Sequence, residues 1–118
     1  MEVFEKYDFL KRISNELRLD FETQDWGIIN SCPDRLEEFI QYFKSNSHYP
    51  DIIKYDLFEL IIASYNDFLL EENYAVNKSI VNEFIKENSN LDNLKPIIEY
   101  WAQLDENEYP ISQLLKVM

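Results

Sequence analysis

The chain has 118 residues, a length that suits a single domain with one hydrophobic core. Its net charge is −12 at pH 7, so nucleic-acid backbones and anionic membranes would repel it, and direct binding to either is not expected. Hydrophobic residues make up 46% of the chain, with eight Phe, eight Tyr and two Trp, which is a globular composition and argues against disorder.

The cysteine content and the hydropathy pattern predict a cytoplasmic protein. A lone Cys32 cannot form an internal disulfide, which favours a reducing compartment. No secretory leader is visible, because four charged residues interrupt the first ten positions. The longest apolar-rich stretch, residues 57–70, contains polar side chains and is too short to span a bilayer.

The first half of the chain predicts two helices around an irregular segment. Residues 3–19 carry apolar side chains every three or four positions, at Val3, Tyr7, Leu10, Ile13 and Leu17. Residues 21–29 have no such period, and Asp25-Trp26-Gly27 indicates a turn or a short extended piece, so pairing as a strand stays open. The second helix begins near Pro33 and ends at the polar residues 45–47, with a core face of Leu36, Phe39, Ile40 and Phe43.

The third predicted helix, residues 51–72, is the most apolar. Apolar side chains cover nearly its whole circumference, which is typical of a helix at the centre of a bundle. The rest of this helix is a narrow, mainly polar stripe that must contact solvent or other polar groups. It consists of Glu59, Ala63, Asn66 and Asp67.

Three shorter helices complete the prediction. The fourth runs from residue 77 or 79 to residue 88, the fifth follows a cap at Asn93, and the last begins at Pro110. Their inward residues are expected to be Ile80, Val81, Phe84 and Ile85, then Leu94, Ile97, Ile98, Trp101 and Leu104, then Ile111, Leu114, Leu115 and Met118. The sequence thus predicts an all-α fold in which residues 1–118 form a single helical domain, a bundle or short superhelix of about five to six helices.

No grouping of residues indicates catalysis. The only His, His48, lies in a polar loop and is expected to be exposed. The N-terminus of a helix can lower the pKa of a nearby thiol, and Cys32 directly precedes the second predicted helix. We nevertheless interpret Cys32 as a packed residue beside the start of that helix. One Gly excludes a phosphate-binding loop, and one Cys with one His cannot complete a structural zinc site. We therefore expect neither an enzyme nor a cofactor.

Acidic residues gather in two stretches that lack Lys and Arg. One lies between Lys54 and Lys78 and the other between Lys95 and Lys116. Acids without local counter-ions should produce a coherent negative field that attracts a basic partner, although acidity can also serve solubility alone. The partner-binding residues predicted from these stretches are Asp56, Glu59, Asp67, Glu71, Glu72, Tyr74, Glu99, Asp105, Glu106 and Glu108. The acid cluster around residues 105–108 lacks the spacing of a calcium loop, so no metal is expected there.

Part of the chain resembles a known family. Residues 25–30 (DWGIIN), Arg35 with Glu38-Phe39-Ile40, and residues 57–66 (LFELIIASYN) are similar to small bacterial immunity proteins of contact-dependent growth inhibition and polymorphic toxin systems. The resemblance covers roughly residues 22–72. It implies a stoichiometric inhibitor that binds a cognate toxin domain, often a basic nuclease, and it carries over no list of interface residues.

An alternative function follows from the helical composition. An acidic helical adaptor or regulatory subunit would bind a partner peptide or protein in a hydrophobic groove. The resemblance favours the inhibitor, and the charge pattern adds slightly to that preference.

Overall fold

The computed structural model describes residues 3–72 and 74–118, and these residues form an all-α fold without strands. The predicted fold class is therefore confirmed. Five helices have eight or more residues, and α2 and α7 are shorter. The elements are α1 (Val3–Leu17), α2 (Trp26–Ile29), the 3-10 turn η1 (Pro33–Arg35), α3 (Leu36–Ser45), α4 (Asp51–Leu70), α5 (Lys78–Asn88), α6 (Lys95–Ala102) and α7 (Ile111–Lys116).

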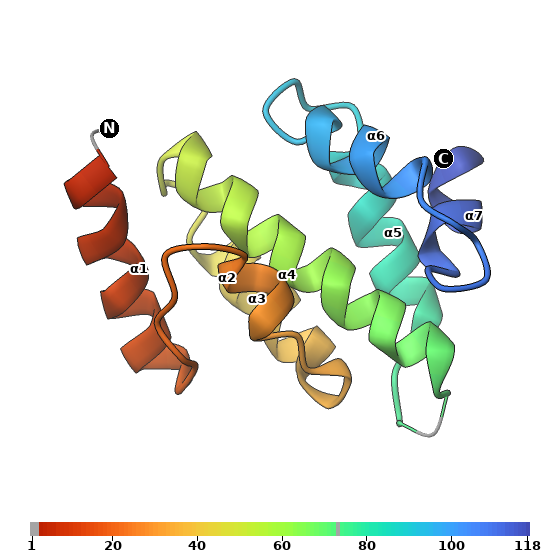
Figure 1. Ribbon diagram of the computed structural model, residues 1–118, viewed down its shortest axis with the longest axis horizontal. Helices are drawn as coiled ribbons and strands as arrows, with labels where there is room; N and C mark the ends of the chain where they lie inside the picture. Colours follow the sequence, from red (N-terminus) through yellow and green to blue (C-terminus); the bar gives the residue numbers. More distant parts are fainter. Residues whose placement is uncertain (1–2, 73) are drawn as a thin grey trace.

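Helix α4 is the centre of the molecule, as its apolar circumference predicts. It packs against α1, α2, η1 and α3 on one side and against α6 and α7 on the other (Figure 1). Twelve of its twenty residues are buried. A helix that is apolar nearly all round reaches its lowest free energy when other helices cover each of its faces. The shorter helices are therefore arranged around α4.

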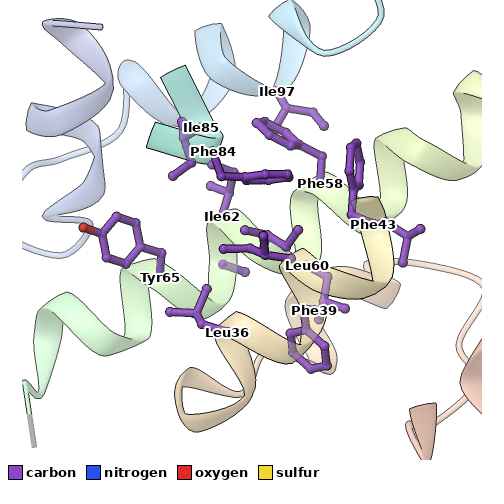
Figure 2. Packing of buried hydrophobic residues seen from close by; sticks show 14 of the residues in the cluster. Leu36, Phe39, Phe43, Phe58, Leu60, Ile62, Tyr65, Phe84, Ile85 and Ile97 are labelled. Carbon is purple, nitrogen blue, oxygen red and sulfur yellow. The ribbon is translucent and has the colours of Figure 1, made fainter. Parts of the chain in front are cut away.

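The core joins α3, α4 and α5 through aromatic side chains. The Phe43 ring meets the Phe84 ring edge-on with centroids 5.2 Å apart, and Phe58 lies 6.3 Å from Phe43 and 6.0 Å from Phe84 (Figure 2). Burying a side chain of this size contributes about 1.5–3 kcal/mol. The predicted core face of α3 is confirmed, because Leu36, Phe39, Ile40 and Phe43 are all buried.

Residues 26–29 form one turn of helix, so the open alternative of a strand is wrong. Trp26 is 3% exposed, and its indole N–H donates to Ser14 Oγ on α1 at 2.8 Å. The Asn30 side chain then accepts from the Asp20 N–H and donates to the Asp20 carbonyl, both at 2.9 Å. These bonds hold the segment between α1 and α4, where a strand would have no neighbouring strand to pair with.

Two residues that were expected to point inward are exposed, and one helix starts a residue later than expected. Ile80 is 43% exposed because α5 buries a narrower face than the sequence period predicts, and Met118 is 37% exposed because α7 ends at Lys116, two residues before it. Helix α6 begins at Lys95 with Leu94, not Asn93, before it. Among the described residues, no helix is long and apolar enough to cross a membrane.

Candidate protein-binding surface

A hollow lies at the C-terminal end of α4. Its volume is about 350 Å³, and it is lined by Pro33, Asp67, Leu70, Glu71 and Tyr74. Three of these residues, Asp67, Glu71 and Tyr74, belong to the binding set predicted from the sequence. We call this feature the α4-end hollow.

The segment before η1 builds one wall of the α4-end hollow. Ser31 Oγ donates to Asp67 Oδ2 at 2.5 Å, and the Cys32 N–H donates to Ser64 Oγ at 2.9 Å. Both acceptors lie on α4, one helical turn apart. These two bonds hold the chain along α4 and place Pro33 beside the last turn of the helix.

The α4-end hollow combines apolar surface with negative charge. Leu70 is 52% exposed and Tyr74 is 36% exposed, so both present apolar area to solvent. Asp67 and Glu71 form no ion pair with any Lys or Arg in the described part of the chain. Protein interfaces typically use such a combination, an aromatic or aliphatic anchor surrounded by polar groups.

Lysines from outside the two acidic stretches pair with three of the predicted acids. Lys78 pairs with Glu72, Lys6 Nζ lies 3.3 Å from Asp56 Oδ2, and Lys116 Nζ lies 2.7 Å from Glu106 Oε1. The expectation that the acids of both stretches lack nearby counter-ions is therefore wrong for these three. The folded chain brings in cations that the linear charge pattern places elsewhere.

Asp56 and Glu59 lie farther back on α4, where Asp56 is buried and Glu59 is half-buried. Asp56 is 9% exposed, and burial raises the pKa of its carboxyl despite the opposing effect of Lys6. Burial also raises the pKa of Glu59, and the charges of Asp56 and Asp25 raise it further. Eleven residues separate Asp56 from Asp67, which is about 16 Å along a helix axis. Asp56 therefore does not contribute to the α4-end hollow.

The predicted acids of the C-terminal stretch form a separate exposed surface. Glu99 lies on α6, and Asp105, Glu106 and Glu108 lie in the linker before α7. The linker is ordered, because Asp105 Oδ1 accepts from the Asn107 N–H at 2.8 Å and the Asp105 carbonyl accepts from the Tyr109 N–H at 2.7 Å. None of these four residues lines the α4-end hollow.

The two candidate reactive side chains lie in ordinary structural environments. Burial raises the pKa of the Cys32 thiol to about 11, and its bond to the Asp34 carboxylate adds to the effect. The helix-terminus effect that would lower this pKa is therefore outweighed. His48 is exposed, and its ring meets the Tyr49 ring edge-on at 5.0 Å. No group of three or more His, Cys, Asp or Glu side chains within residues 3–72 and 74–118 is placed to hold a metal ion.

Two residues of the α4-end hollow were missed by the sequence interpretation. Leu70 was counted among the apolar residues of the central helix, and no local signal shows that the last turn of α4 extends beyond the core. Pro33 was noted only as a helix start. Its position beside Asp67 depends on the Ser31 and Cys32 contacts to α4, which join residues more than thirty positions apart.

Comparisons with known proteins give no family assignment. No protein-family model, no curated protein and no solved structure matches this chain.

Proposed function

We propose that this chain is an immunity protein that binds a cognate, basic bacterial toxin domain and neutralises it by one-to-one association, without catalysis. The observation that carries the proposal is the α4-end hollow. There, exposed Leu70 and Tyr74 lie beside the carboxylates of Asp67 and Glu71, which form no ion pair with the described Lys and Arg residues. The resemblance of residues 22–72 to immunity proteins supports the same conclusion.

The charge of the whole chain suits this role. A net charge of −12 attracts a basic partner over several ångströms and raises the association rate at low salt. A nuclease binds phosphates through Lys and Arg, and carboxylates on an inhibitor can pair with the same side chains. The apolar side chains of the α4-end hollow would then supply short-range affinity that charge alone does not provide.

The test is co-expression with the toxin domain encoded by the neighbouring open reading frame. Wild-type protein is expected to protect the cell and to form a tight one-to-one complex. Leu70→Ser with Glu71→Lys is expected to lower the affinity at least tenfold, because one change removes apolar contact and the other reverses a charge. A toxin domain that kills equally well with and without this protein would overturn the proposal.

Matched variants separate binding from folding and from catalysis. Leu91→Ser with Glu22→Lys makes the same two types of change at exposed positions outside the predicted binding set, and it is expected to protect like wild type. A Cys32→Ala, His48→Ala double variant is also expected to protect fully. Loss of protection in the second variant alone would favour an enzyme.

A second candidate function has its own structural feature. A hollow of about 410 Å³ between α4 and α7 is lined mainly by apolar residues, namely Leu69, Pro110, Gln113, Leu114 and Val117. Such a surface favours a helical adaptor that takes a partner peptide. Capture of one housekeeping protein by wild type, but not by a Val117→Glu variant, would support the adaptor over the inhibitor.

A further inference from the structure

A second concave surface lies between α3 and α5. Its volume is about 350 Å³, and its lining residues are Gln41, Lys44, Ile80, Glu83, Phe84 and Glu87. We call it the α3–α5 groove. Phe84 is 1% exposed and Ile80 is 43% exposed, so Ile80 presents accessible apolar surface beside a buried ring.

The α3–α5 groove and the α4-end hollow border the same connecting segment. Tyr74 lines the hollow and Ile80 lines the groove, six residues later in the chain. The segment between them is fixed to α3, because the Asn77 N–H donates to Glu37 Oε1 at 3.1 Å. Asn77 also caps α5, and its side chain accepts from the N–H groups of Ser79 and Ile80. One partner can therefore contact both concave surfaces across this segment.

The charged side chains that line the α3–α5 groove are two carboxylates and one ammonium group, so their net charge is negative. Glu83 and Glu87 are exposed, lie one turn apart on α5 and form no ion pair with the described Lys and Arg residues. Lys44 Nζ lies over the Phe84 ring, 5.9 Å from its centroid. Glu37 at the start of α3 adds a further exposed carboxylate. The groove thus combines accessible apolar surface at Ile80 with a rim that is acidic apart from Lys44.

We propose that the α3–α5 groove binds a basic amphipathic helix of the same partner that contacts the α4-end hollow. An apolar side chain of that helix lies against the exposed part of Ile80, and Lys or Arg residues four apart face Glu83 and Glu87. Residues four apart on a helix have Cβ atoms about 5–6 Å from each other, so two basic side chains match two acidic ones on the facing helix. The proposal rests on the proposed function and extends its interface.

Charge complementarity excludes the other occupants of the α3–α5 groove. A second copy of this chain would bring another twelve negative charges to an acidic rim, which costs several kcal/mol for each close like-charge contact. Nucleic acid and anionic lipid would meet the same repulsion.

The first test uses charge-matched variants and the toxin domain of the neighbouring reading frame. Glu83→Lys with Glu87→Lys and Ile80→Ser is expected to raise the Kd at least tenfold, mainly through slower association from the charge changes and faster dissociation from Ile80→Ser. The control carries Asp8→Lys, Glu22→Lys and Leu91→Ser, which make the same changes at exposed positions outside the predicted binding set, and its Kd is expected to change less than threefold. Equal Kd values for both variants would overturn the inference and leave the proposed function standing.

The second test needs no toxin. The probe is a synthetic peptide of Leu and Lys in a helical repeat about five turns long. Its binding is measured from changes in the backbone amide chemical shifts of the full chain in NMR spectra. Shifts are expected to concentrate on residues 41–44 and 80–87, and a peptide with Glu in place of Lys is expected to cause none. Shifts centred on residues 99–108 would overturn the inference. If the toxin domain fails to bind wild type, the proposed function is overturned. The peptide titration still shows whether the α3–α5 groove binds a basic helix.

Discussion

Gly27 allows α2 to approach α4 closely. A Cβ atom at this position would lie 2.7 Å from the Leu60 nitrogen and 3.1 Å from the Leu60 Cα, both of them backbone atoms. Backbone in the middle of a buried helix has little freedom to move away. Asp25, two residues earlier, has φ of 54°, a left-handed conformation that turns the chain into α2. The only glycine of the chain is thus required by a contact between elements.

Gly27→Ala is expected to lower the free energy of unfolding by about 1–3 kcal/mol. The gain in helix propensity from Ala, about 0.5–1 kcal/mol, opposes this loss but is smaller. Urea unfolding followed by circular dichroism measures the difference, with Gln24→Ala at an exposed neighbouring position as the control. An unchanged midpoint for Gly27→Ala would mean that α2 does not pack on α4 as described.

At the scale of elements, polar contacts attach α1 to the neighbouring segments α2, η1, α3 and α4. Trp26 donates to Ser14, and Tyr42 and Arg35 donate to Glu16 and to the Leu17 carbonyl. The Lys6–Asp56 ion pair joins α1 directly to α4. The ion pair offsets only part of the free energy that burying the Asp56 carboxylate costs, because burial raises the pKa of Asp56 more than Lys6 lowers it. Removing a carboxylate from water costs more here than its pairing returns.

The raised pKa predicts the pH dependence of this attachment. The folded state binds the Asp56 proton more tightly than the unfolded state does. The resulting contribution to the free energy of unfolding is therefore fully present below the ordinary pKa of 3.8 and is lost as the pH rises through the raised pKa. Asp56→Asn is therefore expected to gain stability relative to wild type as the pH rises from about 3 to 7. Urea unfolding across this range measures the difference.

Glu38 provides a control of opposite sign. Arg35 donates two hydrogen bonds to its carboxylate, at 2.8 and 2.7 Å, and these bonds lower the pKa of Glu38 below its ordinary 4.5. Its contribution is present above pH 4.5 and is lost as the pH falls through the lowered value. Glu38→Gln should therefore lose stability relative to wild type as the pH rises. Parallel curves for the two variants would contradict the assigned shifts.

At the scale of the whole molecule, charge repulsion opposes a compact state. Ion pairs at Asp56, Glu72 and Glu106 neutralise part of the acidity, but the chain keeps a net charge of −12. Pairs exposed to solvent, such as the one between Lys116 and Glu106, contribute only about 0–1 kcal/mol each. Most of the stability must come from the apolar core around α4, while the unpaired acids remain available to attract a partner.

Raising NaCl from about 10 mM to about 500 mM is expected to raise the Tm by a few degrees, because salt screens repulsion between like charges. The Asp105→Lys, Glu108→Lys variant, which has four fewer net negative charges, should gain less from the same salt. Differential scanning calorimetry measures both shifts. A Tm that falls with salt in the wild type would mean that the ion pairs, and not the net charge, dominate its electrostatics.

Periodicity in the sequence was sufficient to predict the fold class and the central place of α4. The core faces of α3 and α4 depend on spacing within one helix, and such a pattern is visible in a single stretch of chain. Asp67, Glu71 and Tyr74 were predicted from a different signal, the stretch without Lys or Arg, and they lie close in space because one helical turn and the following loop bring them together. The burial of Asp56 and the exposure of Ile80 were not predicted, because each depends on which neighbouring helix covers the position.

The sequence by itself determined that this is an acidic helical protein and which faces its longer helices bury, because both follow from composition and local spacing. Only the tertiary structure decided where that acidity remains unpaired. Lys6 reaches Asp56 from α1, and Lys116 reaches Glu106 from α7, while Asp67 and Glu71 stay without a cation at the α4-end hollow among the described residues. Coulomb attraction depends on distance in space, and the packing of helices around α4 sets those distances.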